Sequence, residues 1–389
     1  MRKCEVSGMT KRNKKTLINN LITFGIVIVA FIYCQLSADG ALGAGLKMSK
    51  SMKGQLVPIC AWIVMAVSLN LVVGISGELS LGHAGFMSVG AFTGIVVSTW
   101  MKSAFAMDDG ILRLIIAMIV GGVFAGIVGV LIGIPVLRLR GDYLAIVTLA
   151  FGEIIRNIMN CVYVSVDGKA LHFGFLNPNL EGKLVLNGPN GAVGVEKVST
   201  FVMGFALVIF ALIVVLNLIN SRSGRAIMAI RDNRIAAESM GINSTKYRMM
   251  AFVTAAVLAG MAGALYGLNY SGLAVSKFKF DQSINVLVFV VLGGIGSIRG
   301  SVIAATVLTI LPEQLRAFSD YRMLVYAIVL ILVMLATNNA RLKAWFSSLR
   351  ARRLNKAEEA TADAVAEKAE EAVETVQTEK VEEGGKADE

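Results

Sequence analysis

Long apolar runs alternate with short polar segments along most of this chain. A membrane-spanning helix needs about 20 predominantly apolar residues, and nine stretches are close to that length or longer. They are residues 17–37, 56–75, 79–100, 112–134, 143–164, 200–220, 249–270, 284–312 and 321–338. The pattern predicts an all-α, polytopic bundle of transmembrane helices, with a membrane domain that extends over residues 17–338.

The run 284–312 is too long for one helix, and the sequence GGIGSIRG interrupts it. A glycine costs about 1 kcal/mol in a helix interior, and an arginine at the bilayer centre costs at least ~2.5 kcal/mol. We therefore expect a break at the cytoplasmic face, which divides the run into two short passes and gives about ten helices. A re-entrant hairpin is the alternative. The residues of this break are Gly293, Gly294, Gly296, Arg299 and Gly300.

The basic residues set the expected orientation, because short loops rich in Lys and Arg stay in the cytoplasm. Six of them occur within residues 1–16, ahead of the first run. A cleaved signal peptide is the alternative there, but the many later runs favour an uncleaved first helix. Ten spans place the basic segments 221–248 and 341–356 inside, although the lysines of loop 39–55 then face outward. We expect a multi-pass protein of the bacterial plasma (inner) membrane with both termini in the cytoplasm.

Composition supports a membrane protein and limits its partners. Only 16% of the residues are charged, whereas soluble domains carry about 25%. The net charge of +10 hides a division, because residues 357–389 contain 12 acidic and 3 basic residues and the remainder carries +19. The basic excess suits anionic lipid and an acidic partner surface, and no pattern indicates nucleic acid. The segment 339–389 is expected to be a disordered cytoplasmic tail, basic and then acidic.

Catalytic and metal chemistry find little support in the sequence. The four cysteines have no paired spacing and there are only two histidines, which argues against a disulfide framework and a metal site. The chain contains no phosphate-binding loop of the GxxxxGK[ST] type. We therefore expect a protein that is not an enzyme and that binds no cofactor itself.

The polar segment 221–248 separates two apolar runs and carries six basic residues. We expect a short helix within it that fits a cleft on a soluble partner. Ala236, Ala237 and Gly241 are small enough for close approach, and the charged residues around them can form salt links. A merely solvated basic loop is the alternative. The charged residues are Arg231, Asp232, Arg234 and Glu238.

Polar residues within the apolar runs are candidates for the transport pathway. The stretch 70–92 mixes glycines with polar side chains, which is typical of a helix that lines a cavity or is buried in protein. Tight packing, with Glu78 in a cytoplasmic turn, is the alternative. An ionisable residue such as Glu153, about 15 Å into its span, is functional by default, but Arg156 can pair with it. His83 by itself is better explained as a structural histidine. The candidates are Asn70, Glu78, Ser80, His83 and Glu153.

Several motifs together carry a family resemblance over residues 56–338. They are NLVVGISGELSLGHAGFMSVGAF (70–92), GDYLAIVTLAFGEIIR (141–156), NGPNG (187–191), AIRDNRIAAESMGIN (229–243), VVLGGIGSIRGSVIAA (290–305) and LPEQLR. With them the chain resembles the permease subunits of branched-chain amino acid ABC importers, specifically the LivM type, which have the type II importer fold. One departure is Ile235, where the general importer motif has a glutamate.

The resemblance implies a translocation pathway for leucine, isoleucine and valine that is coupled to separate ATPases. The implied partners are a second permease subunit of the LivH type, two ATPase subunits that bind ATP and Mg²⁺, an extracytoplasmic amino-acid-binding protein, and membrane lipid. Alternatives are the same class with urea or another amino acid as cargo, and an ion-driven secondary transporter using Glu153. The resemblance assigns ATPase coupling to Arg231, Asp232, Asn233, Ala236, Ala237, Glu238 and Gly241.

Overall fold

The computed structural model describes residues 50–315 except 106, 140 and 177–179, together with single positions among 25–35 and 324–335. The chain divides into the units Met1–Arg322 and Met323–Glu389, and the first unit is the subject below. The predicted terminal segments 1–16 and 339–389 lie outside the described residues, as do nearly all of the predicted spans 17–37 and 321–338.

The described part of the chain contains six helices that are long and apolar enough to cross a membrane. They match six predicted runs, with ends that differ by a few residues. In the first, α2 continues directly into a short π-helix, η2. The elements are α2 Lys50–Asn70 with η2 Leu71–Ser76, α3 His83–Phe105, α4 Gly110–Val136, α5 Asp142–Cys161, α6 Phe201–Asn220 and α9 Ser244–Gly267.

Helices α3, α4 and α9 pack most extensively on one another. A Cβ added at Gly90 of α3 would overlap the backbone of Gly260 in α9, and a Cβ at Gly260 would in turn overlap Gly121 of α4. Small residues allow this close approach of helices in lipid, where dispersion contacts replace the hydrophobic driving force. The glycines of these runs therefore allow α3, α4 and α9 to pack closely at the centre of the bundle.

The predicted break in the run 284–312 is present. Helix α10 covers Phe280–Gly293 and α11 covers Ile298–Gln314. The turn between them uses positive φ angles of 91° at Gly294 and 83° at Gly296, which favour glycine. Helix α10 begins four residues earlier than the predicted run and, at about 1.5 Å per residue, is shorter than a bilayer core of about 30 Å.

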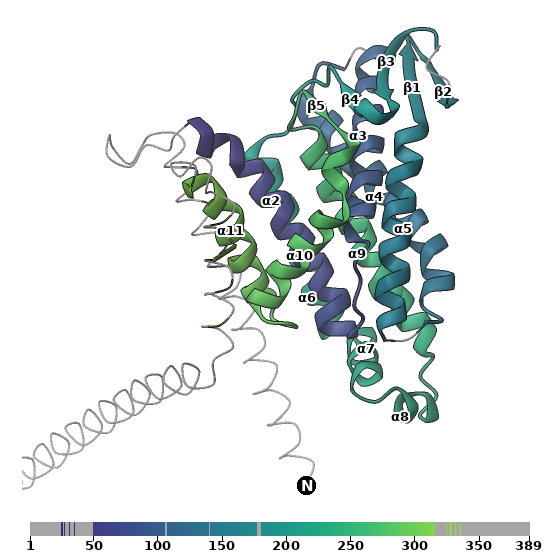
Figure 1. Cartoon of the computed structure of the whole chain (residues 1–389), viewed down its shortest axis with the longest axis vertical. Coiled ribbons are helices and arrows are strands. Elements are labelled where there is room, and N and C mark those ends of the chain that lie inside the picture. Colours follow the sequence, from purple (N-terminus) through teal and green to yellow (C-terminus); the bar gives the residue numbers. More distant parts are fainter. Residues whose placement is uncertain are drawn as a thin grey trace, which may run out of the picture. The chain divides into compact units, whose positions relative to one another are not determined.

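An antiparallel sheet of five strands, in the order β2-β1-β3-β4-β5, interrupts the otherwise helical fold. No strand was predicted in this region. The segment NGPNG (187–191) joins β3 to β4, with a hydrogen bond from Asn187 N to Gly191 O (2.8 Å). The sheet lies at the end of the unit opposite α7 and α8 (Figure 1). The strands are β1 Val162–Asp167, β2 Ala170–Phe175, β3 Lys183–Asn187, β4 Ala192–Val193 and β5 Gly272–Leu273.

Two short helices, α7 Arg222–Asp232 and α8 Arg234–Ser239, form the polar segment between α6 and α9. A side chain that precedes each of α7, α8 and α9 accepts a hydrogen bond from a backbone amide of the first turn. Such N-caps satisfy amides that have no partner within the helix. The segment is therefore folded, with defined helix starts. The caps are Ser221, Asn233 and Asn243.

Candidate functional site

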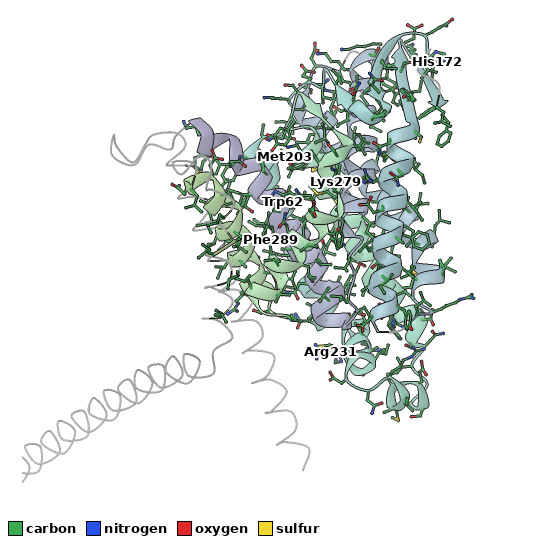
Figure 2. The ribbon with its side chains drawn as sticks, in the orientation of Figure 1. Trp62, His172, Met203, Arg231, Lys279 and Phe289 are labelled. Atoms are coloured by element: carbon green, nitrogen blue, oxygen red, sulfur yellow. The ribbon has the colours of Figure 1, made fainter. Side chains whose placement is uncertain are left out.

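The α7–α8 segment, defined as residues 222–240 to include the C-cap of α8, projects from the end of the unit that is farthest from the sheet. Figure 2 places Arg231 there and His172 at the opposite end. The predicted salt links are present, with Arg231 Nη2 at 3.0 Å from Asp232 Oδ1 and Arg234 Nε at 2.7 Å from Glu238 Oε1. The Arg234–Glu238 pair has i,i+4 spacing, which stabilises a short helix. The segment thus keeps its shape while it projects from the helical bundle.

Two large apolar side chains at and just after α8 are strongly exposed. Ile235 is 81% exposed and Met240 is 82% exposed. Ala237, by contrast, is buried within the chain, so among the small residues of the motif Ala236 is the exposed alanine. Gly241 has a φ of 80° and nothing within 4 Å of an added Cβ, so in this chain its backbone conformation requires glycine. The apolar part of the surface open to a partner is therefore formed by Ile235, Ala236 and Met240.

Arg231 connects this segment to the end of the first described span. Its Nη1 donates a hydrogen bond to the carbonyl oxygen of Gly74 in η2 (2.9 Å). A Cβ added at Gly77 would lie 2.5 Å from Arg231 Cγ, so glycine there lets the arginine lie against the backbone. Helix α7 and the α2–η2 span are consequently in direct contact.

Asn70, completely buried, connects the same span to the turn between α10 and α11. Its Nδ2 donates to Ser301 Oγ (2.8 Å), and its Oδ1 accepts from Gly296 N (2.9 Å). A Cβ at Gly74 would overlap the backbone of Gly296. The contacts Arg231–Gly74 and Asn70–Gly296 therefore join α7, η2 and the predicted helix break in one continuous chain.

Glu78 and Arg248 form an ion pair in which both side chains are buried. Arg248 also donates from Nη1 to the carbonyl oxygen of Leu137 at the end of α4 (3.1 Å). Charges this far from water persist only when they are paired. The pair fixes the linker 77–82 against the first turns of α9 and the end of α4.

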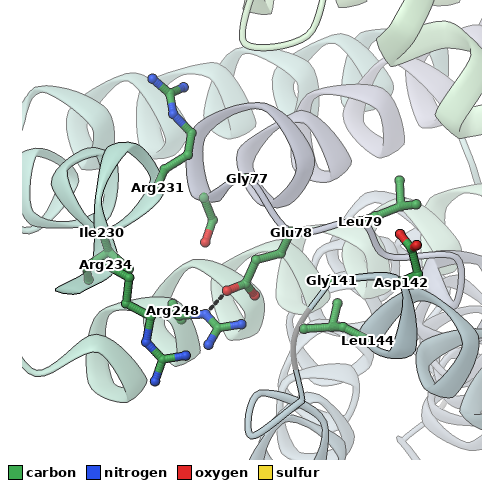
Figure 3. A pocket seen from close by; sticks show the side chains of 11 residues that line it. Gly77, Glu78, Leu79, Gly141, Asp142, Leu144, Ile230, Arg231, Arg234 and Arg248 are labelled. Atoms are coloured by element: carbon green, nitrogen blue, oxygen red, sulfur yellow. Dashed lines mark ion pairs between the residues drawn. The ribbon is translucent and has the colours of Figure 1, made fainter.

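A cavity of about 410 Å³ lies beside this ion pair, and we call it the arginine pocket (Figure 3). The linker 77–82, the start of α5, the α7–α8 segment and Arg248 of α9 border it, and it is open to the outside of the unit. It is lined by Ser76, Gly77, Glu78, Leu79, Gly141, Asp142, Leu144, Ile230, Arg231, Arg234 and Arg248.

The linker 77–82 leads into α3 through hydrogen bonds to two other helices. Leu81 N donates to Thr148 Oγ1 of α5 (3.0 Å), and Ala84 N donates to Ser283 Oγ of α10 (3.1 Å). His83 Nε2 lies 2.8 Å from Ser68 Oγ and the ring is buried, as a structural histidine would be. Among the described residues, the buried Ser80 Oγ has no hydrogen-bond partner.

Glu153 has two partners. Arg156 Nη2 lies 2.6 Å from Glu153 Oε2, which confirms the predicted pair within α5. The other oxygen, Oε1, accepts from the backbone amide of Phe280 (3.2 Å), the first residue of α10. A carboxylate there also suits the positive end of a helix dipole. Glu153 therefore caps α10, and α3 and α10 both begin beside α5.

One protein family and several known proteins match the sequence of this chain. The family model for the permease component of branched-chain amino acid transport systems matches residues 51–334. That range contains every contact described above. The chain belongs to this permease family. With its six candidate spans, this permease is a multi-pass membrane protein.

Relatives of this permease include transport proteins with different cargoes. The high-affinity branched-chain amino acid permease LivM of Escherichia coli is 31% identical over 308 residues, 70% of this chain and 66% of LivM. LivH of the same bacterium is 35% identical over 117 residues, 30% of this chain and 38% of LivH. The fructose import permease FruG of Bifidobacterium longum is 25% identical over 262 residues, 64% and 70% of the two chains. This chain thus spans 66% of the length of LivM. No solved structure matches it.

Sequence reasoning about this permease missed Arg248 as a partner of Glu78, and Ser283 and Ser301 as partners of the linker and of Asn70. Arg248 did carry a signal, because it is a charge at the edge of an apolar run. The two serines carried none, since serine is common wherever helices pack closely.

Proposed function

We propose that this permease is a subunit of an ATP-driven importer of branched-chain amino acids, and that its α7–α8 end faces the cytoplasm. The observation that carries the proposal is the projecting α7–α8 segment, which exposes Ile235 and Met240 and holds the membrane helices through Arg231. A soluble ATPase could engage such a surface without entering the bilayer. In this proposal ATP and Mg²⁺ bind to two ATPase subunits and the permease does no chemistry.

Transmission of the ATPase motion would follow the contacts of Arg231 and Asn70. When the ATPases close, α8 moves with them, and Arg231 carries the motion to Gly74 in η2. Asn70 then shifts the α10–α11 turn through Gly296 and Ser301. The first residue of α10, Phe280, is bound by Glu153 of α5, close to the start of α3. Movement of α10 would therefore change how α3, α5 and α10 pack at the middle of the α5 span. Alternation between inward-facing and outward-facing states would result.

The partners are proposed from the family. The match to LivH over part of the chain supports a second, related permease that shares the pathway. An extracytoplasmic binding protein would deliver the amino acid at the sheet end, and lipid would surround the remaining apolar surface. FruG, a fructose permease, favours one alternative, which is the same mechanism with another cargo. An ion-driven carrier is disfavoured because Glu153 is engaged by Arg156 and by Phe280 N.

Uptake of radiolabelled leucine into vesicles tests the proposal. The vesicles carry the assembled complex with ATP inside, the binding protein outside and an uncoupler present. Uptake that needs ATP and the binding protein and survives the uncoupler is the expected result, and a complex with inactive ATPases is the matched control. Loss of uptake on uncoupling would indicate an ion-driven carrier. ATP hydrolysis stimulated by a binding protein for another solute, without leucine uptake, would keep the mechanism and change the cargo.

A further inference from the structure

The arginine pocket has a chemical character that the coupling contacts do not require. Arg231 and Arg234 lie on one side of it, and Asp142 lies on the other, with the Glu78–Arg248 pair between them (Figure 3). Leu79, Leu144 and Ile230 supply aliphatic surface. Positive and negative groups therefore border one cavity together with branched apolar side chains. The Arg231 guanidinium already binds Gly74 O and Asp232, and Arg234 Nε binds Glu238, which leaves the other Arg234 N–H groups for a ligand.

This combination restricts what the pocket can hold. An anionic lipid headgroup or a free phosphate would gain from the arginines but would be repelled by Asp142 and Glu78. A purely apolar molecule would desolvate Asp142 and the remaining N–H donors of the arginines without offering them a hydrogen bond, which is costly. A free amino acid with an aliphatic side chain carries a carboxylate for the arginine side, an ammonium for Asp142, and an apolar group for the leucines and Ile230. The volume of about 410 Å³ falls within the range of about 300–1,000 Å³ typical of small-molecule sites.

A ligand in the arginine pocket would affect the arrangement of the helices, because the pocket lies between two different parts of the fold. Ile230, Arg231 and Arg234 belong to the α7–α8 segment, whereas Asp142 and Leu144 belong to the start of α5. A ligand that contacts both walls binds only while the two walls keep this separation. It would therefore stabilise this arrangement against any other, in proportion to its difference in affinity between the two.

We propose that the arginine pocket binds a free aliphatic amino acid from the cytoplasm and that its occupancy slows import. The inference rests on the proposed function, because it takes the α7–α8 segment to be the moving part and the cargo class to be the ligand. Import would then decrease as the imported amino acid accumulates on the inner side.

The first experiment compares initial rates of labelled leucine uptake into vesicles that contain ATP, with or without millimolar unlabelled leucine inside. Preloading should slow wild-type uptake several-fold. Asp142→Asn should raise the internal leucine concentration for half-inhibition by about tenfold, the scale of one charge-assisted hydrogen bond, with each protein's inhibition measured relative to its own rate without internal leucine. Arg225→Gln is the matched control, because Arg225 is exposed on α7 and does not line the pocket. Equal inhibition of wild type and Asp142→Asn, or none in wild type, would overturn the inference.

The second experiment does not depend on transport or on the variant's stability. A photoreactive leucine analogue is cross-linked to the wild-type complex, and the labelled peptides are mapped. We expect labelling within residues 76–79, 141–144 and 230–234, and leucine should protect these residues from labelling. Isocaproate and isoamylamine each lack one charged group, so at the same concentration they should protect at least about tenfold less. Labelling confined to residues outside these three ranges, equal protection by isocaproate, or protection by phosphatidylglycerol would overturn it. Specific labelling without any ATP-driven uptake would support the pocket while refuting the importer.

Discussion

At the residue scale, the Glu78–Arg248 pair places two charges in the interior of the helical bundle. Both side chains are buried, and they come from elements 170 positions apart in sequence. Burying two charges costs several kcal/mol per ion unless attraction and hydrogen bonds offset it. Arg248 has the additional acceptor Leu137 O, so the pair is part of a small network. Loss of one partner leaves the other charged and buried.

Removal of the Glu78 carboxylate should therefore be strongly destabilising. We predict that Glu78→Gln lowers the free energy of unfolding by about 3 kcal/mol, and that adding Arg248→Met recovers part of this loss because no uncompensated charge remains. Thermal unfolding of the purified protein in detergent measures both. Arg234→Gln, at the more exposed pair with Glu238, is the control and should cost no more than about 0.5 kcal/mol. Similar losses for Glu78→Gln and Arg234→Gln would contradict the prediction.

A second cluster links the sheet end to the helices. Lys102 Nζ and Arg113 Nη2 both lie within 2.9 Å of Glu196 Oε2, and their hydrogen bonds hold the pKa of Glu196 below its ordinary value of 4.5. Folding therefore gains stability from this carboxylate above pH 4.5, and the gain is lost as the pH falls through the lower folded pKa. We predict that the difference in Tm between wild type and Glu196→Gln narrows as the pH falls below 4.5. A constant difference down to pH 3 would contradict this. Asp281→Asn provides a control for general acid effects.

At the element scale, η2 is the contact between α7 and the α10–α11 turn. A Cβ at Gly74 would overlap both the Asn70 side chain and the backbone of Gly296. We predict that Gly74→Ala separates η2 from the turn, so that the complex still hydrolyses ATP while leucine uptake falls at least about tenfold. Gly54→Ala on α2 has nothing within 4 Å of its added Cβ and should leave both activities unchanged. The ratio of uptake to hydrolysis is the measurement, and an unchanged ratio in Gly74→Ala would count against the transmission path.

The exposed apolar side chains of the α7–α8 segment should anchor the ATPase. We predict that Ile235→Ser weakens association of the permease with its ATPase at least about tenfold, because truncating a central interface anchor typically costs 2 kcal/mol or more. Co-purification over a range of ATPase concentrations measures it. Val193→Ser is the matched control, since Val193 is 55% exposed on the sheet at the opposite end of the unit. If both variants retain the ATPase equally, another surface carries the interface.

The helices and the helix break were predictable because each depends on local sequence. Apolar runs long enough to span a bilayer can be identified from the sequence without knowledge of tertiary contacts. A cluster of glycines at 293–300 indicates a break by itself. The sheet was not predicted, because β1 follows α5 without an intervening turn and β4 and β5 have two residues each. The partners of Glu78 and Asn70, and the contact of Glu153 with Phe280 N, depend on which helices are neighbours, and the order of elements in the sequence does not determine that.

At the scale of the whole molecule, the two ends of the described unit differ in kind. One end carries the short helices α7 and α8 with their arginines, and the other carries the sheet (Figures 1 and 2). The six candidate spans between them are apolar, so in a bilayer the two ends lie on opposite sides. The basic residues of the α7–α8 end favour the cytoplasm, which makes the orientation testable with one residue at each end.

We predict that cysteines at Met240 and Val193 react from opposite sides of the membrane. Both positions are exposed, so in a background without native cysteines a membrane-impermeant maleimide should modify Val193→Cys in intact spheroplasts and Met240→Cys only after permeabilisation. Cys60, which is buried at 3% exposure, can be restored alone as the control and should react in neither condition. The reverse pattern would place α7 and α8 outside. It would remove them from any cytoplasmic ATPase, and with them the coupling path through Arg231 and Asn70.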